Sequence, residues 1–179
     1  MNLTGLSHRE RMVFELFLDS LVPAPHIAEK GRLLDVGSGA GFPGIPLKIC
    51  KPQLNAHLLE ASGKKVSFLK QVVRLLSLEK TEVIRGRIER DPGILHPDGY
   101  HLITARALAP MGQSIMWCAP LLRSGGFLVS FMGGRFEDEL KENRQVIRDH
   151  GLTIHKKISY ILPGKATERA TIILEKKVF

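Results

Sequence analysis

Short apolar runs alternate along this chain with segments in which apolar residues recur every three or four positions. The first pattern is typical of buried strands and the second of amphipathic helices. The predicted strands cover residues 32–36, 55–60, 81–85, 100–104, 127–131, 152–160 and 168–176. The predicted helices cover residues 7–21, the segment from a glycine-rich loop to Cys50, 63–77, a segment that ends near Pro120, and 135–150.

This alternation predicts a doubly wound α/β sheet with its site beyond the carboxyl ends of the strands. Only Leu162-Pro163-Gly164 separates the last two strands, as in a hairpin, so we expect the sheet to end with an antiparallel strand. We expect residues 1–30 to form an N-terminal helical segment packed on a Rossmann-like domain of residues 31–179. Its helix begins with capping-box spacing at Ser7.

The most distinctive stretch is the turn of glycines and prolines after the first predicted strand. Residues 35–39, Asp-Val-Gly-Ser-Gly, fit D-x-G-x-G and resemble the S-adenosylmethionine loop of Rossmann-like methyltransferases. Residues 39–44 also fit G-x-G-x-x-G, the dinucleotide fingerprint, and a small-residue turn without a ligand is a third interpretation. Glu60, at the end of the next strand, can accept hydrogen bonds from ribose hydroxyls. Because S-adenosylmethionine and a dinucleotide both contain ribose, Glu60 predicts a nucleoside cofactor but does not distinguish between the two.

Composition narrows the class of protein. The chain has 179 residues, 44% of them hydrophobic and 25% charged, as expected for one globular domain. No apolar run reaches the roughly 18 residues of a membrane span, and the N-terminus lacks the pattern of a signal peptide. Cys50 and Cys118 are isolated among apolar residues and the histidines are dispersed, so we expect no disulfide, no metal site and a cytoplasmic location.

The net charge of +8 favours a polyanionic partner such as RNA. Lys64 and Lys65 lie in the first turn of the predicted helix 63–77, where the helix dipole disfavours cations, which makes them candidates for RNA contact. Lys70 and Arg74, further along the same helix, are more simply explained as a solvated face.

The motifs, taken in order, resemble the glucose-inhibited division protein B family, bacterial enzymes that methylate guanine N7 in small-subunit (16S) ribosomal RNA. The most specific match is Gly-Phe-Pro-Gly-Ile-Pro at residues 41–46. The matching pieces are Asn2-Leu3-Thr4, residues 17–21, residues 35–47, Leu58-Leu59-Glu60, Gly63-Lys64-Lys65, Phe68-Leu69, Arg106-Ala107, Trp117-Cys118 and Glu168-Arg169.

The resemblance implies a class I methyltransferase fold: a mostly parallel seven-stranded sheet with an antiparallel last strand and helices on both faces. It also implies S-adenosyl-L-methionine as cofactor and the small ribosomal subunit as partner, and we expect a monomer. The resemblance places cofactor contacts at Gly37, Phe42, Ile88, Glu89 and Arg106. The loop motif and the strand after it add Asp35, Ser38, Gly39, Gly41 and Glu60, and the candidates for RNA contact are Lys64, Lys65 and Arg135.

Three departures from the family concern the substrate side. Relatives carry helices before the Asn-Leu-Thr segment, where this chain starts. Glu15-Leu16 and Met132-Gly133 stand where relatives have Arg-His and Lys-Gly, although Arg135 lies near the second position. A catalytically impaired RNA- or ribosome-binding relative therefore stays open as an alternative, and a nicotinamide-dependent oxidoreductase as a second.

The chemistry of guanine N7 requires no general base, because N7 has an in-plane lone pair and carries no proton. Alignment would dominate catalysis. Residues 104–107, Thr-Ala-Arg-Ala, contain neither the cysteine nucleophile of carbon-5 pyrimidine methylation nor the Asp/Asn-Pro-Pro-aromatic turn of amine methylation. Arg106 is the candidate that orients the substrate through guanine O6 or a phosphate. The alternative is a supporting salt bridge from Arg106 to Glu89.

Overall fold

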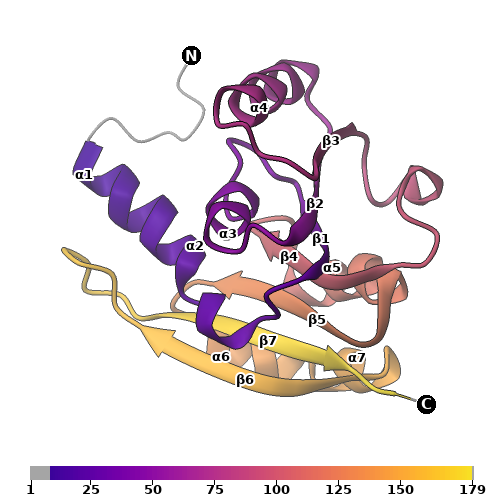
Figure 1. The fold of residues 1–179 in the computed structure, drawn as a ribbon. Coiled ribbons are helices and arrows are strands. Elements are labelled where there is room, and N and C mark those ends of the chain that lie inside the picture. The colour runs from indigo at the N-terminus through magenta and orange to yellow at the C-terminus, as the bar shows by residue number, and fades with distance from the viewer. Residues whose placement is uncertain (1–8, 179) are drawn as a thin grey trace.

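A seven-stranded sheet forms the middle layer of the computed structural model, which describes residues 9–178 (Figure 1). The strands pair in the order β3-β2-β1-β4-β5-β7-β6, with β1 to β5 parallel and β7 antiparallel to both of its neighbours. The predicted fold class is therefore confirmed. The strands are β1 Gly31–Val36, β2 Leu54–Glu60, β3 Thr81–Arg85, β4 Tyr100–Arg106, β5 Leu122–Met132, β6 Leu152–Tyr160 and β7 Arg169–Lys176.

Helices cover both faces of the sheet because its central strands are apolar on both sides. In β1, Leu34 and Val36 pack into a core with α5, α6 and α7, whereas Leu33 packs into the opposite core with α3. The helices are α1 Arg9–Met12, α2 Asp19–Leu21, α3 Gly44–Cys50, α4 Gly63–Leu75, α5 Met111–Cys118, α6 Phe136–Glu142 and α7 Arg144–Asp149. The other helical segments are the π-helix η1 Val13–Leu18 and the 3-10 helices η2 Ala24–His26, η3 Pro92–Ile94 and η4 Ala119–Leu121.

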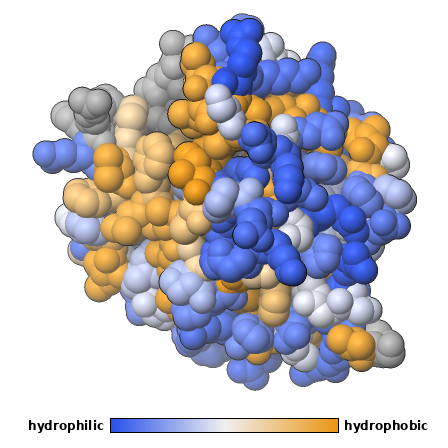
Figure 2. All heavy atoms as spheres, viewed as in Figure 1, coloured by the Kyte–Doolittle hydropathy of each residue, from blue (hydrophilic) through white to orange (hydrophobic). Residues whose placement is uncertain are grey.

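The spacing of apolar residues in the N-terminal helical segment, α1 with η1 and α2, predicts a stripe of Val13, Phe14, Phe17, Leu18 and Leu21, and three of these residues are exposed. Val13, Phe17 and Leu18 are 48%, 44% and 43% exposed, whereas the polar Asp19 and Ser20 are buried. Figure 2 shows hydrophobic surface gathered on this side of the molecule. The π-helical turn and the ion pairs of Asp19, described below, set which face of this segment points inward. The predicted cap at Ser7 and the motif at residues 2–4 lie outside the described residues.

The predicted helix 135–150 is two helices, which corrects the prediction. Asn143 separates α6 from α7 with φ −100° and ψ 10°, and its side-chain Nδ2 donates to Glu139 O at 2.8 Å. Such a bond from an asparagine side chain to the backbone competes with regular helix. The inward residues are still the predicted ones, since Phe136, Leu140 and Ile147 are all buried.

Both cysteines are free thiols, Cys50 exposed at the end of α3 and Cys118 buried under the sheet. Burial raises the pKa of the Cys118 thiol to about 12, so it stays protonated and acts as an apolar core residue. Within residues 9–178, no helix combines the length and apolarity needed to cross a bilayer. The same residues contain no group of three or more His, Cys, Asp or Glu side chains placed to hold a metal ion.

Candidate active site

The glycine-rich loop between β1 and α3 is fixed to the end of β2 by its backbone. Gly37 N and Ser38 N both donate to Leu59 O, at 2.9 and 3.0 Å. Gly37 has φ 70°, a conformation that favours glycine, and a Cβ there would lie 3.3 Å from Leu108 Cδ1. The loop therefore needs glycine at this position for both conformation and space.

Asp35 supports this loop from beneath. Its carboxylate is fully buried and accepts hydrogen bonds from Thr104 Oγ1 at 2.7 Å and from Gly44 N at 3.2 Å. Burial raises the pKa of Asp35, and these hydrogen bonds oppose the rise. A Cβ on Gly44 would lie 2.7 Å from Asp35 Oδ2, so only glycine fits there. Asp35 thus holds the loop in place and lies outside the cavity walls, although the sequence predicts it as a cofactor contact.

The start of α3 leaves no backbone donor for a pyrophosphate. Gly44 N donates to the buried Asp35 carboxylate and Ile45 N donates to Gly41 O at 2.8 Å. The residues before and after this pair are prolines, which have no N–H. A dinucleotide fold needs these donors for its phosphates, so the geometry argues against the G-x-G-x-x-G interpretation.

Glu60 fixes the loop to the beginning of α4. Its Oε2 accepts a hydrogen bond from Gly39 N at 2.9 Å and its Oε1 accepts one from Ser62 N at 2.8 Å. Each carboxylate oxygen has a further lone pair. The side chain is therefore held rigidly and can still accept hydrogen bonds from a ribose, as the sequence predicts.

A cavity of about 280 Å³ opens beyond the carboxyl ends of β1, β2 and β3; we call it the β1–β3 cavity. It brings together Gly37, Glu60, Ile88 and Glu89, four of the predicted cofactor contacts. The other predicted loop residues do not line it: Ser38, Gly39, Gly41 and Phe42 lie in the loop beside it. The remaining wall is Val36, Leu59, Ala61, Gly86, Arg87, Ala107 and Leu108.

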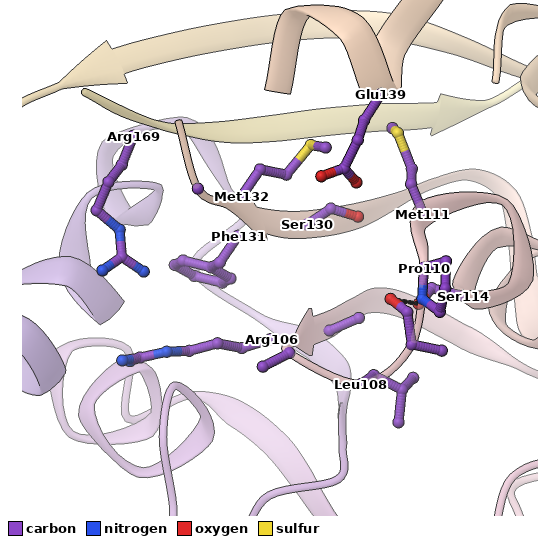
Figure 3. A pocket seen from close by; sticks show the side chains of 14 residues that line it. Arg106, Leu108, Pro110, Met111, Ser114, Ser130, Phe131, Met132, Glu139 and Arg169 are labelled. Carbon is purple, nitrogen blue, oxygen red and sulfur yellow. Dashed lines mark hydrogen bonds between the residues drawn. The ribbon is translucent and has the colours of Figure 1, made fainter. Parts of the chain in front are cut away.

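A second cavity, of about 450 Å³, lies beyond β4 and β5; we call it the β4–β5 cavity (Figure 3). It shares Ala107 and Leu108 with the β1–β3 cavity, so the two meet at the loop after β4. Figure 3 shows Arg106 and Arg169 at one end and Glu139 at the other. The sequence places Arg106 with the cofactor contacts, whereas the structure places it in this second cavity.

The two arginines are held by Asp19, a fully buried residue of the N-terminal helical segment. Asp19 Oδ2 lies 3.5 Å from Arg106 Nη1, and Asp19 Oδ1 lies 3.3 Å from Arg169 Nε. Tyr160 OH donates to Asp19 Oδ1 at 2.8 Å, and Arg106 Nη2 donates to Glu15 O at 2.7 Å. Burial raises the pKa of Tyr160 to about 12, so its hydroxyl remains a donor.

Arg106 does form a salt bridge, as one of the two interpretations of the sequence predicts, but Glu89 is the wrong partner. Glu89 lies 3.4 Å from Arg87, and Arg106 pairs with Asp19 instead. Burial lowers the pKa of Arg106, and the Asp19 carboxylate opposes this effect.

Two of the departures from the family lie at or beside the β4–β5 cavity. Met132 lines the cavity, and Glu15 contacts Arg106 through its carbonyl. The Glu15 carboxylate accepts hydrogen bonds from Arg11 and lies 2.9 Å from Lys165, and these two cations lower its pKa.

The candidates for RNA contact lie outside both cavities. Lys64 is exposed and Lys65 half-exposed in the first turn of α4, and Arg135 is exposed directly before α6. Lys70 and Arg74 are also exposed, which agrees with a solvated face.

The strand order, the glycine loop and the two adjoining cavities define a class I S-adenosylmethionine-dependent methyltransferase fold. Among similar solved structures is M. jannaschii TYW2 in complex with AdoMet, with a TM-score of 0.75 and 10% identity over 98% of this chain and 80% of that one. Another is an rRNA methylase from Streptococcus thermophilus, with a TM-score of 0.65 and 16% identity over 90% of this chain and 95% of that one. At these identities the likeness concerns the fold alone.

Sequence comparison defines the family. The family model described as rRNA small subunit methyltransferase G, GidB, matches residues 1–166. The chain is 36% identical to ribosomal RNA small subunit methyltransferase G of Lactobacillus helveticus, over 99% of this chain and 76% of the relative. It is 33% identical to the protein of the same name from Alkaliphilus metalliredigens, over 98% of this chain and 75% of the relative. The chain belongs to the rRNA small subunit methyltransferase G family, which confirms the resemblance seen in its sequence.

Proposed function

We propose that this protein transfers the methyl group of S-adenosylmethionine to N7 of a guanine in 16S ribosomal RNA. Membership of the family supports this function. The structural observation that carries it is the junction of the two cavities at Ala107 and Leu108. One cavity has the features of a nucleoside site and the other has room for an acceptor base beside it.

The β1–β3 cavity fits the cofactor. Gly37 leaves space that a side chain would reduce, and Glu60 offers acceptors for ribose hydroxyls. Ile88, which is buried, and Glu89 would border the rest of the nucleoside. When bound, S-adenosylmethionine supplies an electrophilic methyl group on a sulfonium.

The chain's residues then contribute alignment rather than proton transfer. Ala107 and Leu108 separate the two cavities and would set the approach of N7 to the methyl group. Arg106, fixed by Asp19, would orient the acceptor through guanine O6 or a phosphate. No residue is needed as a general base, because N7 carries no proton.

Lys64, Lys65 and Arg135 would contact the RNA backbone outside the cavities. The net charge of +8 supports a salt-dependent association with small subunits. We propose that the protein acts in the cytoplasm as a monomer, with residues 1–30 packed as a segment on the methyltransferase domain.

The test is transfer of labelled methyl from S-adenosylmethionine to small subunits that lack the mark, followed by identification of the modified nucleoside. The expected product is 7-methylguanosine. Cofactor binding without transfer would instead support a catalytically impaired relative. Thermal stabilisation by NAD but not by S-adenosylmethionine would support an oxidoreductase.

A further inference from the structure

The β4–β5 cavity has a polarity that runs from one end to the other. Arg106 and Arg169 lie at one end and share a single buried carboxylate, Asp19, so this end carries a net positive charge. Glu139, from α6, lies at the other end (Figure 3). A ligand that fits this cavity should have acceptors on one side and donors on the other.

The Glu139 carboxylate points into the cavity and is free to bind a ligand. No cation within residues 9–178 forms an ion pair with it. Its neighbours in Figure 3 are the uncharged Met132 and Met111 and the hydroxyl of Ser130. The Ser130 Oγ is buried and has no hydrogen-bond partner in the described part of the chain. Buried polar groups without partners are rare, so this end of the cavity is suited to a ligand with hydrogen-bond donors.

Guanine has the matching polarity. O6 and N7 are acceptors on one side of the base, and N1–H and the N2 amino group are donors on the opposite edge. An ionised carboxylate has only acceptors and can take both donors at once. Adenine presents a lone pair at N1 instead of a donor, which a carboxylate repels.

We propose that Glu139 accepts hydrogen bonds from N1–H and the N2 amino group of the target guanine, which selects guanine and turns N7 toward the junction of the two cavities. This inference rests on the proposed methyl transfer and assigns its base specificity to one side chain. The Arg106 end of the cavity would then face O6 or the adjoining phosphate.

The same contact would assist the reaction. Transfer forms the bond between N7 and the methyl carbon and breaks the bond between that carbon and the sulfonium sulfur, which keeps the electron pair. No proton leaves, so the positive charge moves from sulfur to the purine ring. A carboxylate at the edge of the ring stabilises this charge in the transition state, and more strongly in a cavity shielded from water.

The first test is Glu139→Gln, which keeps the shape of the side chain but removes its charge and one acceptor. We expect kcat/KM with unmethylated small subunits to fall roughly 10- to 100-fold, as for loss of a charge-assisted hydrogen bond. The Kd for S-adenosylmethionine should not change. Glu142→Gln is the matched control, because Glu142 lies exposed on the same helix and outside the cavity; it should behave as wild type.

The second test removes the hydrogen-bond donor of the base instead of the acceptor of the protein. It uses small subunits in which inosine replaces the target guanosine. Inosine keeps N7 and N1–H but lacks the N2 amino group. Wild-type enzyme should lose activity on this substrate by about tenfold, whereas Glu139→Ala should methylate both substrates equally. If the loss of activity caused by inosine were the same in Glu139→Ala as in the wild-type enzyme, Glu139 would not contact the N2 amino group, and the proposal would be overturned.

The outcomes separate this proposal from the function on which it rests. If wild-type enzyme methylates guanine and Glu139→Gln does so equally well, only the role of Glu139 is refuted. A fall in cofactor affinity that matches the fall in kcat/KM would also refute it, because Glu139 would then bind the cofactor. If wild-type enzyme methylates no guanine, the proposed function fails and this inference fails with it.

Discussion

The two cavities that meet at Leu108 are built in different ways. The backbone of consecutive elements forms the β1–β3 cavity: β1, its glycine loop and the ends of β2 and β3. Side chains from distant segments form the β4–β5 cavity, and its two arginines are held by Asp19 from the N-terminal helical segment. The first cavity therefore depends on local backbone conformation, and the second depends on a buried charge network. Variants should be able to damage one without the other.

The largest effect is expected on the affinity for S-adenosylmethionine, from Gly37→Val in the wall of the β1–β3 cavity. The new side chain would meet Leu108 Cδ1 and would sit at φ 70°, where a residue other than glycine costs roughly 1–2 kcal/mol. We expect the Kd for S-adenosylmethionine, measured by calorimetry, to rise at least about 100-fold, or roughly 2.7 kcal/mol.

Gly164→Val is the matched control for Gly37→Val. Gly164 has φ 73° in the turn between β6 and β7, and a Cβ there meets no atom within 4 Å. It should therefore share the backbone strain of Gly37→Val but retain cofactor binding. Equal loss of affinity in both variants would show that strain, rather than filling of the cavity, weakens binding.

The next effect is expected from Asp19→Asn, which acts on the β4–β5 cavity. Removing the carboxylate charge leaves Arg106 and Arg169 without their shared anion. Breaking a buried ion pair costs about 3–5 kcal/mol of folding stability. Because the side chains of Arg106 and Arg169 are 16% and 26% exposed, we expect the free energy of unfolding to fall by about 2–4 kcal/mol. For a chain of this size the Tm should fall by roughly 4–16 °C.

Asp19→Asn should raise KM for small subunits and leave the Kd for S-adenosylmethionine nearly unchanged. Asp98→Asn serves as its control, because Asp98 also pairs with an arginine, Arg32, but is 70% exposed. This surface pair should contribute less than about 1 kcal/mol. If Asp19→Asn weakened cofactor binding as much as substrate use, the two cavities would not be independent.

The difference between the cavities also explains what the sequence could predict. The alternation of strands and helices follows from periodicity, and the glycine loop follows from a motif whose members are neighbours in the chain. Periodicity and this motif therefore placed β1, its loop and Glu60 where the structure has them. Asp35 was found as well, although its role is to hold the loop rather than to contact a ligand. Such motifs can be recognised in the sequence because residues that are neighbours in the chain form this site with their backbone.

The β4–β5 cavity was predicted only in part: the sequence singled out Arg106 and the departure at Met132, but gave no signal for Asp19 as the support of Arg106 or for Glu139. The register of β6 and β7 brings Tyr160 and Arg169 to Asp19 beside Arg106, and the packing of α6 brings Glu139 to the same cavity. Periodicity also failed at the N-terminal helical segment, where it predicted a buried apolar stripe. The ion pairs of Asp19 determine which face of this segment is buried, because a buried carboxylate is stable only while it keeps its charged partners.

A smaller effect, on the salt dependence of binding to small subunits, is expected from the exposed cations at the starts of α4 and α6. Lys64→Ala removes a charge beside the start of α4, and Arg135→Ala removes one beside α6. If a residue contacts an RNA phosphate, its loss should reduce the slope of log affinity against log salt for small subunits by about 1. The Kd for S-adenosylmethionine should not change in either variant.

Lys70→Ala is the control for Lys64→Ala, since Lys70 lies exposed one to two turns further along the same helix. A changed slope for Lys64 alone would place the RNA against the cofactor side, and one for Arg135 alone against the acceptor side. Unchanged slopes for both would contradict their assignment as phosphate contacts.

The smallest effect is expected at the opposite end of the sheet, where His101 lies near the start of β4. Its Nδ1 accepts a hydrogen bond from Arg32 N at 3.0 Å, which requires that nitrogen to be unprotonated. Burial, and then the charges of Arg123 and Arg32, lower the pKa of His101 in the folded protein. The unfolded chain therefore binds more protons as the pH falls below about 6.5, and stability present above that pH is lost.

His101→Asn should reduce the fall in Tm between pH 7.5 and pH 5.5, because Asn Oδ1 can accept the same hydrogen bond without titrating. Part of the fall should remain, since burial also lowers the pKa of His57. His155→Asn, at an exposed position, is the control for replacing a histidine with asparagine. A wild-type pH dependence in His101→Asn would contradict this role. Neither variant should change the Kd for S-adenosylmethionine, because both cavities open at the other end of the strands and are supported by groups that do not contact His101.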